Sequence, residues 1–234
     1  MNIAFQILNS WEENAEAWIQ ALEKSDILSR KITNQAILVA IQSHLSASVL
    51  DLGCGEGWLC RALMESGYDA YGVDATAKLI ETAKKKGNKG SFARLTFQEL
   101  TEWFHSKLES ELLGNLAKSP KDGAVFNFCL YEKEGLKELL MAAAKLIKPK
   151  GKILIQTIHP FTMQLLELPY QSQWMEDAWI GLKGEFRNGH PWYFRTFEDW
   201  ISEFTTSGLK VENIYEPTAP MAKNPSSVIF VLSM

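Results

Sequence analysis

The chain has 234 residues, enough for one domain with a full core, and its hydrophobic, charged and aromatic fractions of 46%, 22% and 11% are those of a globular protein. Its net charge of −4 argues against a nucleic-acid partner, which would require a basic surface. Because we find no signal peptide, no apolar window long enough for a membrane span and no regular spacing of the three cysteines, we expect a cytoplasmic protein without a membrane partner, disulfide framework or metal site.

The first 45 residues form a separate segment whose apolar residues recur at helical spacing. We expect one or two helices here, laid as a cap across the open end of a sheet. Trp11 and Trp18 lie about two turns apart, and the simplest interpretation is that both pin the first helix to the protein. A position beside the substrate is the second interpretation for Trp18.

From about residue 48 onward, short apolar runs alternate with helical patterns, which is typical of βα units around a mostly parallel sheet. The run at 124–130 is unbroken and suits a strand that is covered on both faces. The expected strands are 49–52, 70–73, 92–95, 124–130, 153–158, 209–215 and 227–232, and the clearest helices are 58–66, 76–86, 136–147 and 196–206.

The pattern changes between residues 159 and 195, where aromatic, proline and glycine residues are frequent and periodicity is weak. A long irregular segment inside a compact domain is usually a lid or a binding loop. We therefore expect a single domain over residues 1–234, with an N-terminal helical cap at 1–45 and an aromatic-rich lid insertion at 159–195.

A glycine-rich turn, Gly53-Cys54-Gly55-Glu56-Gly57, follows the first strand and leads into a helix. Glycines let the backbone approach a ligand closely, and the following helix begins with free N–H groups. Asp74 ends the next strand, about twenty residues further on, which is the spacing expected for a carboxylate that accepts both hydroxyls of a ribose. The two features together predict a nucleoside site.

Two details argue against a nicotinamide dinucleotide as the ligand of this site. The turn has the spacing G-x-G-x-G, whereas a pyrophosphate is held by G-x-G-x-x-G. In addition, the carboxylates of Asp51 and Glu56 would oppose two phosphate charges. They are compatible with a ligand that carries an ammonium and a sulfonium, and S-adenosylmethionine has both and no phosphate.

The run from Val49 to Gly57 resembles the first motif of class I (Rossmann-like) S-adenosylmethionine-dependent methyltransferases, and Asp74 is similar to the ribose-binding acid of that family. Further similarities follow in order over roughly residues 45 to 232, at 128–131, 146–151, 193–200 and 208–217. The resemblance implies a doubly wound, mostly parallel sheet of seven strands in the order 3-2-1-4-5-7-6, with helices on both faces. It also implies S-adenosylmethionine as cofactor and S-adenosylhomocysteine as product.

The same resemblance implies roles for individual residues. Gly53, Cys54 and Gly55 would pass under the methionine part of the cofactor, and Asp51 would hold the loop or the ammonium group. Asp74 would hold the ribose. The remaining implied contacts are Ala75 beside the adenine, Phe97 and Gln98 flanking it, Phe128 and Leu130 below the sulfonium, and Arg30 at the methionine carboxylate.

A base is needed only if the acceptor is a hydroxyl or a protonated amine. His159 follows the fifth strand and is the candidate for that role, with a hydrogen-bonded loop histidine as the alternative. The candidate substrate contacts are Trp18, Tyr131, Trp192, Tyr193 and Arg195. Each has a structural alternative: Tyr131 could begin a helix, the lid aromatics could form a small core, and Arg195 could pair with Glu198 or Asp199 instead of an anionic acceptor.

Three function classes stay open. The favoured hypothesis is methyl transfer to an O or N atom of a small molecule, by a monomer or a homodimer. A protein or nucleic-acid methyltransferase is the second hypothesis, although the Pro-Pro-aromatic motif of amino-methylating nucleic-acid enzymes is absent after Asn127. The third is a relative that binds the cofactor without catalysis, and a nicotinamide oxidoreductase is a remote fourth.

Overall fold

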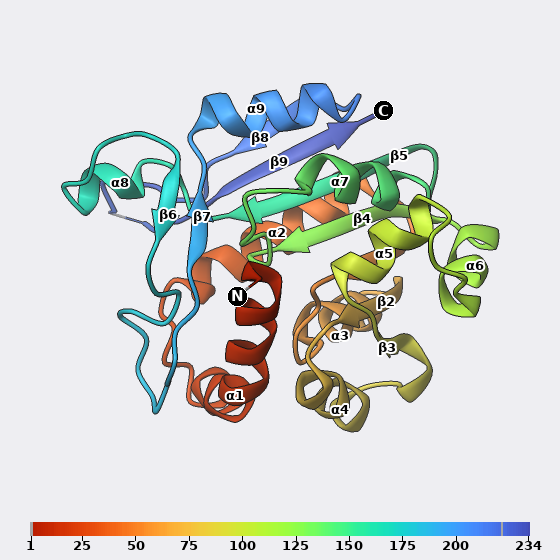
Figure 1. The fold of residues 1–234 in the computed structure, drawn as a ribbon, viewed down its shortest axis with the longest axis horizontal. Helices are drawn as coiled ribbons and strands as arrows, with labels where there is room; N and C mark the ends of the chain where they lie inside the picture. The colour runs from red at the N-terminus through yellow and green to blue at the C-terminus, as the bar shows by residue number, and fades with distance from the viewer. Residues whose placement is uncertain (1, 221) are drawn as a thin grey trace.

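A seven-stranded sheet forms the centre of the protein in the computed structural model, which describes residues 2–220 and 222–234 (Figure 1). Its strands are β1 (Ser48–Leu52), β2 (Asp69–Asp74), β3 (Phe92–Arg94), β4 (Lys121–Asn127), β5 (Ile147–Thr157), β8 (Lys210–Tyr215) and β9 (Val228–Ser233). They are ordered β3-β2-β1-β4-β5-β9-β8, and only β9 pairs antiparallel with its neighbours β5 and β8. Within this sheet β8 and β9 are the sixth and seventh strands, so the order 3-2-1-4-5-7-6 is confirmed.

Helices cover both faces of the sheet because successive strand residues point to opposite sides. Val49, Val125 and Leu154 pack under one helical layer, whereas Leu50 and Phe126 pack under the other. The helices are α1 (Ile3–Glu23), α2 (Arg30–His44), α3 (Trp58–Glu65), α4 (Ala77–Lys86), α5 (Phe97–Phe104), α6 (Glu111–Lys118), α7 (Leu136–Ala144), α8 (Thr162–Leu165) and α9 (Phe197–Thr206). The first layer contains α2, α3 and α4, and the second contains α5, α6, α7 and α9.

Two strand boundaries differ from the expected ones. The strand expected at 124–130 is β4, which begins at Lys121 and ends at Asn127. Its apolar run continues past the strand, but Phe128 has a φ of 54°, and this left-handed conformation turns the chain out of the sheet. The strand expected at 153–158 begins earlier, at Ile147, because β5 also contains the Pro149–Gly151 turn.

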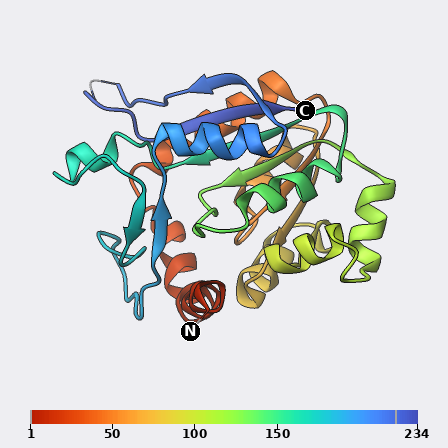
Figure 2. The same ribbon diagram turned by 45° about the horizontal axis from the view of Figure 1, so that its top comes forward.

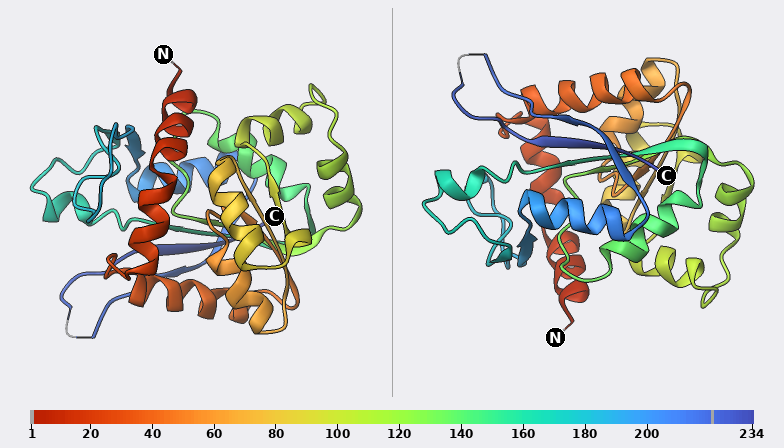
Figure 3. Two further views of the ribbon diagram at one scale, coloured as in Figure 1. Left: turned by 90° about the horizontal axis from the view of Figure 1, so that it is seen from below. Right: turned by 90° about the horizontal axis from the view of Figure 1, so that it is seen from above.

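The N-terminal segment divides into two helices with different surroundings. Residues Ile37 and Ile41 of α2 are fully buried in the core against the sheet, so α2 belongs to a sheet-covering layer, opposite α9 in Figure 3. Only α1 lies across the open end, where Ala15 and Ile19 pack on Leu79 of α4. The expected cap over 1–45 therefore reduces to α1.

The segment from 159 to 195 contains α8 and a small second sheet of β6 (Gln173–Met175) and β7 (Trp192–Phe194). Figures 1 and 2 both show this lid beside α1, beyond the carboxyl ends of the central strands. Among the described residues, no helix is both long and apolar enough to cross a membrane.

A substitution at Phe204 of α9 tests the packing of the core on the sheet face that α9 covers. Its ring is fully buried, 5.1 Å from Phe230 and 5.7 Å from Trp200 between ring centroids. We expect Phe204→Ala to lower the free energy of unfolding by about 3–5 kcal/mol, because it removes transfer energy and leaves a cavity. Ile201→Ala on the exposed face of the same helix should cost at most about 1 kcal/mol. Urea denaturation measures both, and equal effects would contradict the assigned packing.

Candidate functional site

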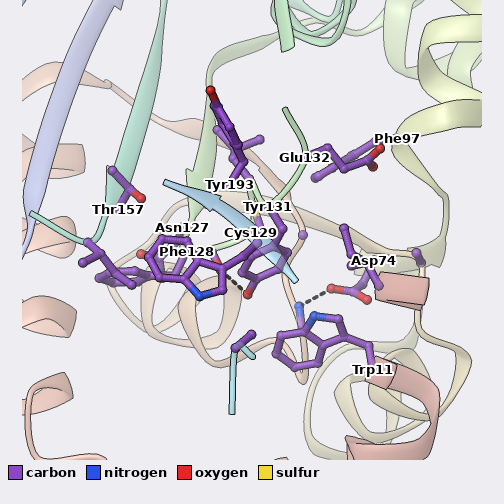
Figure 4. A pocket seen from close by; sticks show the side chains of 18 of the residues that line it. Trp11, Asp74, Phe97, Asn127, Phe128, Cys129, Tyr131, Glu132, Thr157 and Tyr193 are labelled. Carbon is purple, nitrogen blue, oxygen red and sulfur yellow. Dashed lines mark hydrogen bonds between the residues drawn. The ribbon is translucent and has the colours of Figure 1, made fainter. Parts of the chain in front are cut away.

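A cavity of about 1340 Å³ opens at the carboxyl ends of the central strands, between the sheet, α1 and the lid (Figure 4). Pockets for a single drug-sized ligand measure about 300–1,000 Å³, so this one has room for a cofactor and a second molecule. Ligands in open α/β sheets bind at this end of the strands. The residues that line the cavity come from the glycine loop, the ends of β2, β3 and β4, α1, α2 and the lid.

Four N–H groups of the glycine loop are hydrogen-bonded within the protein. The N–H groups of Gly53 and Cys54 both donate to the carbonyl oxygen of Val73, at 2.8 and 2.9 Å. Gly55 N–H donates to Asp74 Oδ2 at 2.9 Å, and Gly57 N–H donates to the Cys54 carbonyl at 3.0 Å. A phosphate site needs these donors free, so the geometry agrees with the phosphate-free ligand inferred from the loop spacing.

No other residue type fits at position 53. Its φ is 81°, and an added Cβ would lie 2.6 Å from Cys129 Cβ. The tip of the Phe97 ring lies 3.6 Å from the same point. The segments that follow β3 and β4 therefore meet over this glycine, which leaves room only for a residue without a side chain.

Asp74 ties the glycine loop to the start of α4. Its Oδ1 accepts the Thr76 N–H at 2.8 Å while its Oδ2 accepts the Gly55 N–H (dashed in Figure 4). Each carboxylate oxygen keeps a second lone pair, and the side chain lines the cavity. Burial raises the pKa of Asp74, and the two backbone hydrogen bonds oppose that shift.

Asp51 is an almost unpartnered carboxylate under the loop. It is 1% exposed, its Oδ2 accepts only a 3.6 Å bond from the Cys60 thiol, and its Oδ1 has no partner among the described residues. Burial raises the pKa of Asp51 to about 7, with a further contribution from the negative charge of Asp74. A cation that binds beside it would stabilise the charged form.

Glu56 lines the cavity, but its carboxylate is already paired within the protein. Its buried carboxylate pairs with Arg61 Nη2 at 2.6 Å and with Lys86 Nζ at 3.8 Å. Lys86 in turn pairs with Glu23 of α1. The charge that was expected to face a cationic ligand is therefore neutralised on the α4 side of the loop.

Arg30 is the first residue of α2 and lines the cavity, as the sequence predicted. Its guanidinium lies 5.0 Å from the ring centroid of Trp58 and 5.9 Å from that of Trp18. Burial lowers the pKa of Arg30 to about 10, so the group keeps its charge at neutral pH. A cation held by aromatic faces in a cavity can pair with a ligand carboxylate.

The other predicted cofactor contacts also line the cavity: Cys54, Ala75, Phe97, Gln98, Phe128 and Leu130. Gln98 turns its amide away, since Nε2 donates to Glu102 on the α5 surface at 2.8 Å. Glu99 forms a capping box with Thr96, whose backbone and side chain both donate to its carboxylate. The Glu99 carboxylate is therefore engaged within the protein, and Gln98 is exposed with its amide nitrogen bonded on the surface of α5.

Aromatic side chains line much of the cavity. Trp192, Tyr193, Tyr131 and Trp18 line it as predicted. Tyr131 has a structural task as well, because its hydroxyl donates to the Phe128 carbonyl at 2.6 Å and so braces the left-handed turn after β4.

Helix α1 is clasped to the lid by hydrogen bonds that the sequence did not indicate. Asn14 donates to the Arg187 carbonyl and accepts the Arg187 N–H, both at 2.7 Å. Ser10 Oγ donates to the Asn188 carbonyl at 2.8 Å and accepts the Trp179 indole N–H at 2.9 Å. The rings of Trp11 and Trp179 meet edge-on, with centroids 4.7 Å apart. These contacts close the cavity on the side where α1 meets the lid.

Arg195 lines the cavity but pairs with neither predicted partner, Glu198 or Asp199, within 4.0 Å. Its Nη2 donates to the carbonyl oxygens of Glu132 and Lys133, at 2.6 and 2.8 Å. The side chain is 2% exposed, and burial lowers its pKa. Arg195 therefore holds the loop between β4 and α7 in place.

His159 is the predicted site residue that the structure does not bring to the cavity. Its Nδ1 accepts the Phe161 N–H at 3.0 Å and its Nε2 pairs with Glu216 at 2.8 Å. It lines a separate pocket of about 450 Å³ that is formed mainly by residues of the lid. The position fits the alternative interpretation, a hydrogen-bonded loop histidine, and does not fit a base beside the acceptor.

Comparisons with known proteins relate this chain to methyltransferases. Residues 15–214 match a family described as a methyltransferase domain. A ubiquinone biosynthesis O-methyltransferase of Dechloromonas aromatica (strain RCB) is 25% identical over 154 residues, which are 64% of this chain and 57% of that protein. The chain spans 41% to 60% of the length of the four such relatives that it matches.

Two solved structures illustrate the shared fold. An S-adenosylmethionine-dependent methyltransferase from Mesorhizobium loti superposes with a TM-score of 0.59 at 19% identity, over 83% of this chain and 96% of that one. Magnesium protoporphyrin IX methyltransferase from Synechocystis PCC 6803, with bound S-adenosylhomocysteine, gives a TM-score of 0.61 at 16% identity, over 99% of both chains.

The raised pKa of Asp51 predicts a pH-dependent stability. Because its pKa is about 7 in the folded chain and 3.8 ordinarily, the folded state favours the protonated form, and stability is lost as the pH rises through about 7. Asp51→Asn cannot ionise. The variant should therefore gain on the wild type as the pH rises from about 4 to about 7, by up to about 4 kcal/mol for a pKa difference of about three units. Thermal unfolding at several pH values measures the difference, and a constant offset would contradict it.

From the hydrogen bonds between α1 and the lid, we expect Asn14→Ala to have a local effect. The substitution leaves the Arg187 N–H and carbonyl without their partners, at a cost of about 1–3 kcal/mol. We expect faster backbone amide exchange over residues 177–190, measured by hydrogen–deuterium exchange, with the central strands unchanged. Gln20→Ala, at an exposed position of the same helix, is the matched control and should leave the lid protected.

Proposed function

Because a methyltransferase domain family matches residues 15–214, this chain belongs to that family, and we propose that it transfers a methyl group from S-adenosylmethionine to an O or N atom of a small molecule. The family predicted from the glycine loop and Asp74 is thereby confirmed. The cofactor, the acceptor class and the residue roles below are parts of the proposal.

One observation carries the choice of cofactor. Val73 and Asp74 take the N–H groups of Gly53, Cys54 and Gly55, while the carboxylates of Asp51 and Asp74 line the same cavity. Such a loop repels a pyrophosphate and suits a nucleoside that carries cationic groups. The residues present therefore fit S-adenosylmethionine, and the S-adenosylhomocysteine bound to the Synechocystis neighbour supports this choice.

Three charged residues bind the cofactor in this proposal. Asp74 accepts the ribose hydroxyls, Asp51 faces the ammonium group and Arg30 pairs with the methionine carboxylate. When bound, S-adenosylmethionine supplies a methyl group that its sulfonium activates. The chain's contribution is to orient the acceptor and exclude water, and alignment alone can provide much of the acceleration.

The acceptor end supports a small, flat molecule. Tyr193 and Trp192 offer aromatic faces, and the clasp between α1 and the lid encloses the space in front of them. A protein or a nucleic acid would need an open cleft. The ubiquinone biosynthesis O-methyltransferases among the relatives favour oxygen as the acceptor atom. A cytoplasmic location and a monomeric or homodimeric state complete the proposal.

The described lining of the cavity contains no histidine, so we assign no histidine base. An acceptor with an acidic hydroxyl would need none, because it reaches the methyl group already ionised or loses its proton to water.

Calorimetric titration of the purified protein with S-adenosylmethionine, with NADH in a parallel titration, tests the cofactor. Saturable binding of S-adenosylmethionine alone supports the proposal, and a screen of phenolic and amine acceptors with a labelled methyl group follows. Binding of NADH alone would overturn it. Binding of S-adenosylmethionine without turnover of any acceptor would favour a relative that binds the cofactor and does not catalyse.

Asp74→Asn tests the ribose assignment. The variant keeps one acceptor oxygen but loses the charge, and a hydrogen bond to a charged group contributes about 1.5–3 kcal/mol. We expect the affinity for S-adenosylhomocysteine to fall by about tenfold to a hundredfold. Asp69→Asn, at the opposite and exposed end of the same strand, is the control. Equal affinities of the two variants would refute the role of Asp74.

A further inference from the structure

The cavity contains a carboxylate that no described residue satisfies. Glu132 lies in the loop between β4 and α7, lines the cavity and is half-buried. Among residues 2–220 and 222–234, no N–H or O–H group donates to its carboxylate, and no cation lies within 4.0 Å of it. Its neighbour Glu134 is 88% exposed and pairs with Lys133. A partly desolvated and accessible carboxylate without a donor is a site for a ligand donor.

The loop that carries Glu132 is held in position. Arg195 Nη2 donates to the Glu132 carbonyl oxygen at 2.6 Å and to the Lys133 carbonyl oxygen at 2.8 Å. The Arg195 guanidinium is itself packed against Tyr193 and Trp200, at 5.2 and 5.1 Å from their ring centroids. Such fixing of the backbone limits where the Glu132 side chain can reach, as expected for a residue that positions a ligand.

Glu132 belongs to the wall where the nucleoside base would lie. The ribose acid Asp74 ends β2, and Phe97 follows the neighbouring strand β3. Phe97 and Cys129 meet over Gly53, so the segment after β4 reaches the segment after β3, and Glu132 is three residues beyond Cys129. Figure 4 shows Glu132 and Phe97 along the same wall, on the α5 side of Asp74.

Of the polar side chains just after β3, Gln98 is exposed and Glu99 is bonded within the first turn of α5. The Gln98 amide donates to Glu102, and the Glu99 carboxylate is held by Thr96. An adenine buried beside Phe97 would still present an exocyclic amine, and a buried donor without an acceptor costs free energy. We propose that Glu132, which comes from the loop after β4, accepts the exocyclic amine of the cofactor's adenine and selects adenine over a base with an oxygen at that position. This inference rests on the proposed cofactor.

The electrostatics of the carboxylate agree with this role. Burial raises the pKa of Glu132, and hydrogen bonding from an amine would stabilise the charged form and oppose that shift. An oxygen in place of the amine would instead meet the negative charge with its own lone pairs.

Glu132→Gln separates recognition of the base from a merely structural effect. The probes are S-adenosylhomocysteine and S-inosylhomocysteine, which has a carbonyl oxygen where adenine has the amine. Calorimetry on the wild type should show a preference of about tenfold to a hundredfold for the adenine compound. In the variant the amide can rotate and donate to the carbonyl oxygen, so the preference should fall to within about threefold, with weaker binding of the adenine compound.

Glu134→Gln is the matched control, two residues along the same loop, and should keep the wild-type preference. Circular dichroism and thermal melting compare the folding of the variants. An equal loss of affinity for both compounds, or unchanged binding of S-adenosylhomocysteine in Glu132→Gln, would overturn the inference while leaving the proposed function standing. If the wild type bound neither compound, the proposed cofactor would fail, and this assignment with it.

Discussion

The site depends on how two oxygen acceptors at the end of β2 hold the glycine loop. The Val73 carbonyl takes the N–H groups of Gly53 and Cys54, and the next residue, Asp74, takes that of Gly55. The loop is thereby fixed without any ligand, and its shape requires the positive φ of Gly53 and the close approach of Cys129. A donor that is already bonded cannot hold an anion, so the same bonds that order the loop also restrict what it can bind.

The charges around the cavity follow a related logic. The Arg30 guanidinium lies among aromatic rings, while Arg195 donates from Nη2 to two backbone carbonyls. The buried carboxylates divide in the same way: Glu56 is neutralised by Arg61, whereas Asp51 is left almost unpartnered. A buried, unpaired charge is costly, so the groups that remain unpaired mark where ligand charges are expected.

Sequence reasoning succeeded where chemistry is encoded locally. The glycine turn, Asp74 and the alternation of strands and helices are short-range patterns that predicted the parallel sheet, and the family resemblance they carry implied the strand order and residues that line the cavity. Contacts between distant segments carry no such pattern. The spacing of Ser10 and Asn14 says nothing about their partners in the lid, and nothing beside Cys129 indicates that it meets Phe97 over Gly53. His159 was misplaced for the same reason: it does follow β5, but Glu216, far along the chain, fixes its ring away from the cavity. Trp11 could be assigned to packing, but its contact with Trp179 could not.

The clasp between α1 and the lid also has a consequence for how the molecule is made. Ser10 and Asn188 are separated by 178 positions along the chain, so the front wall of the cavity joins two segments that leave the ribosome at very different times. Long-range contacts carry the largest loop-closure cost and form late. The parallel strands β1 to β4 can pair while α1 still waits without its partner, and its tryptophans are exposed to solvent or to chaperones during that interval. The order of synthesis thus places the enclosure of the cavity after the pairing of β1 to β4, and β9, which emerges after the lid, completes the central sheet later still.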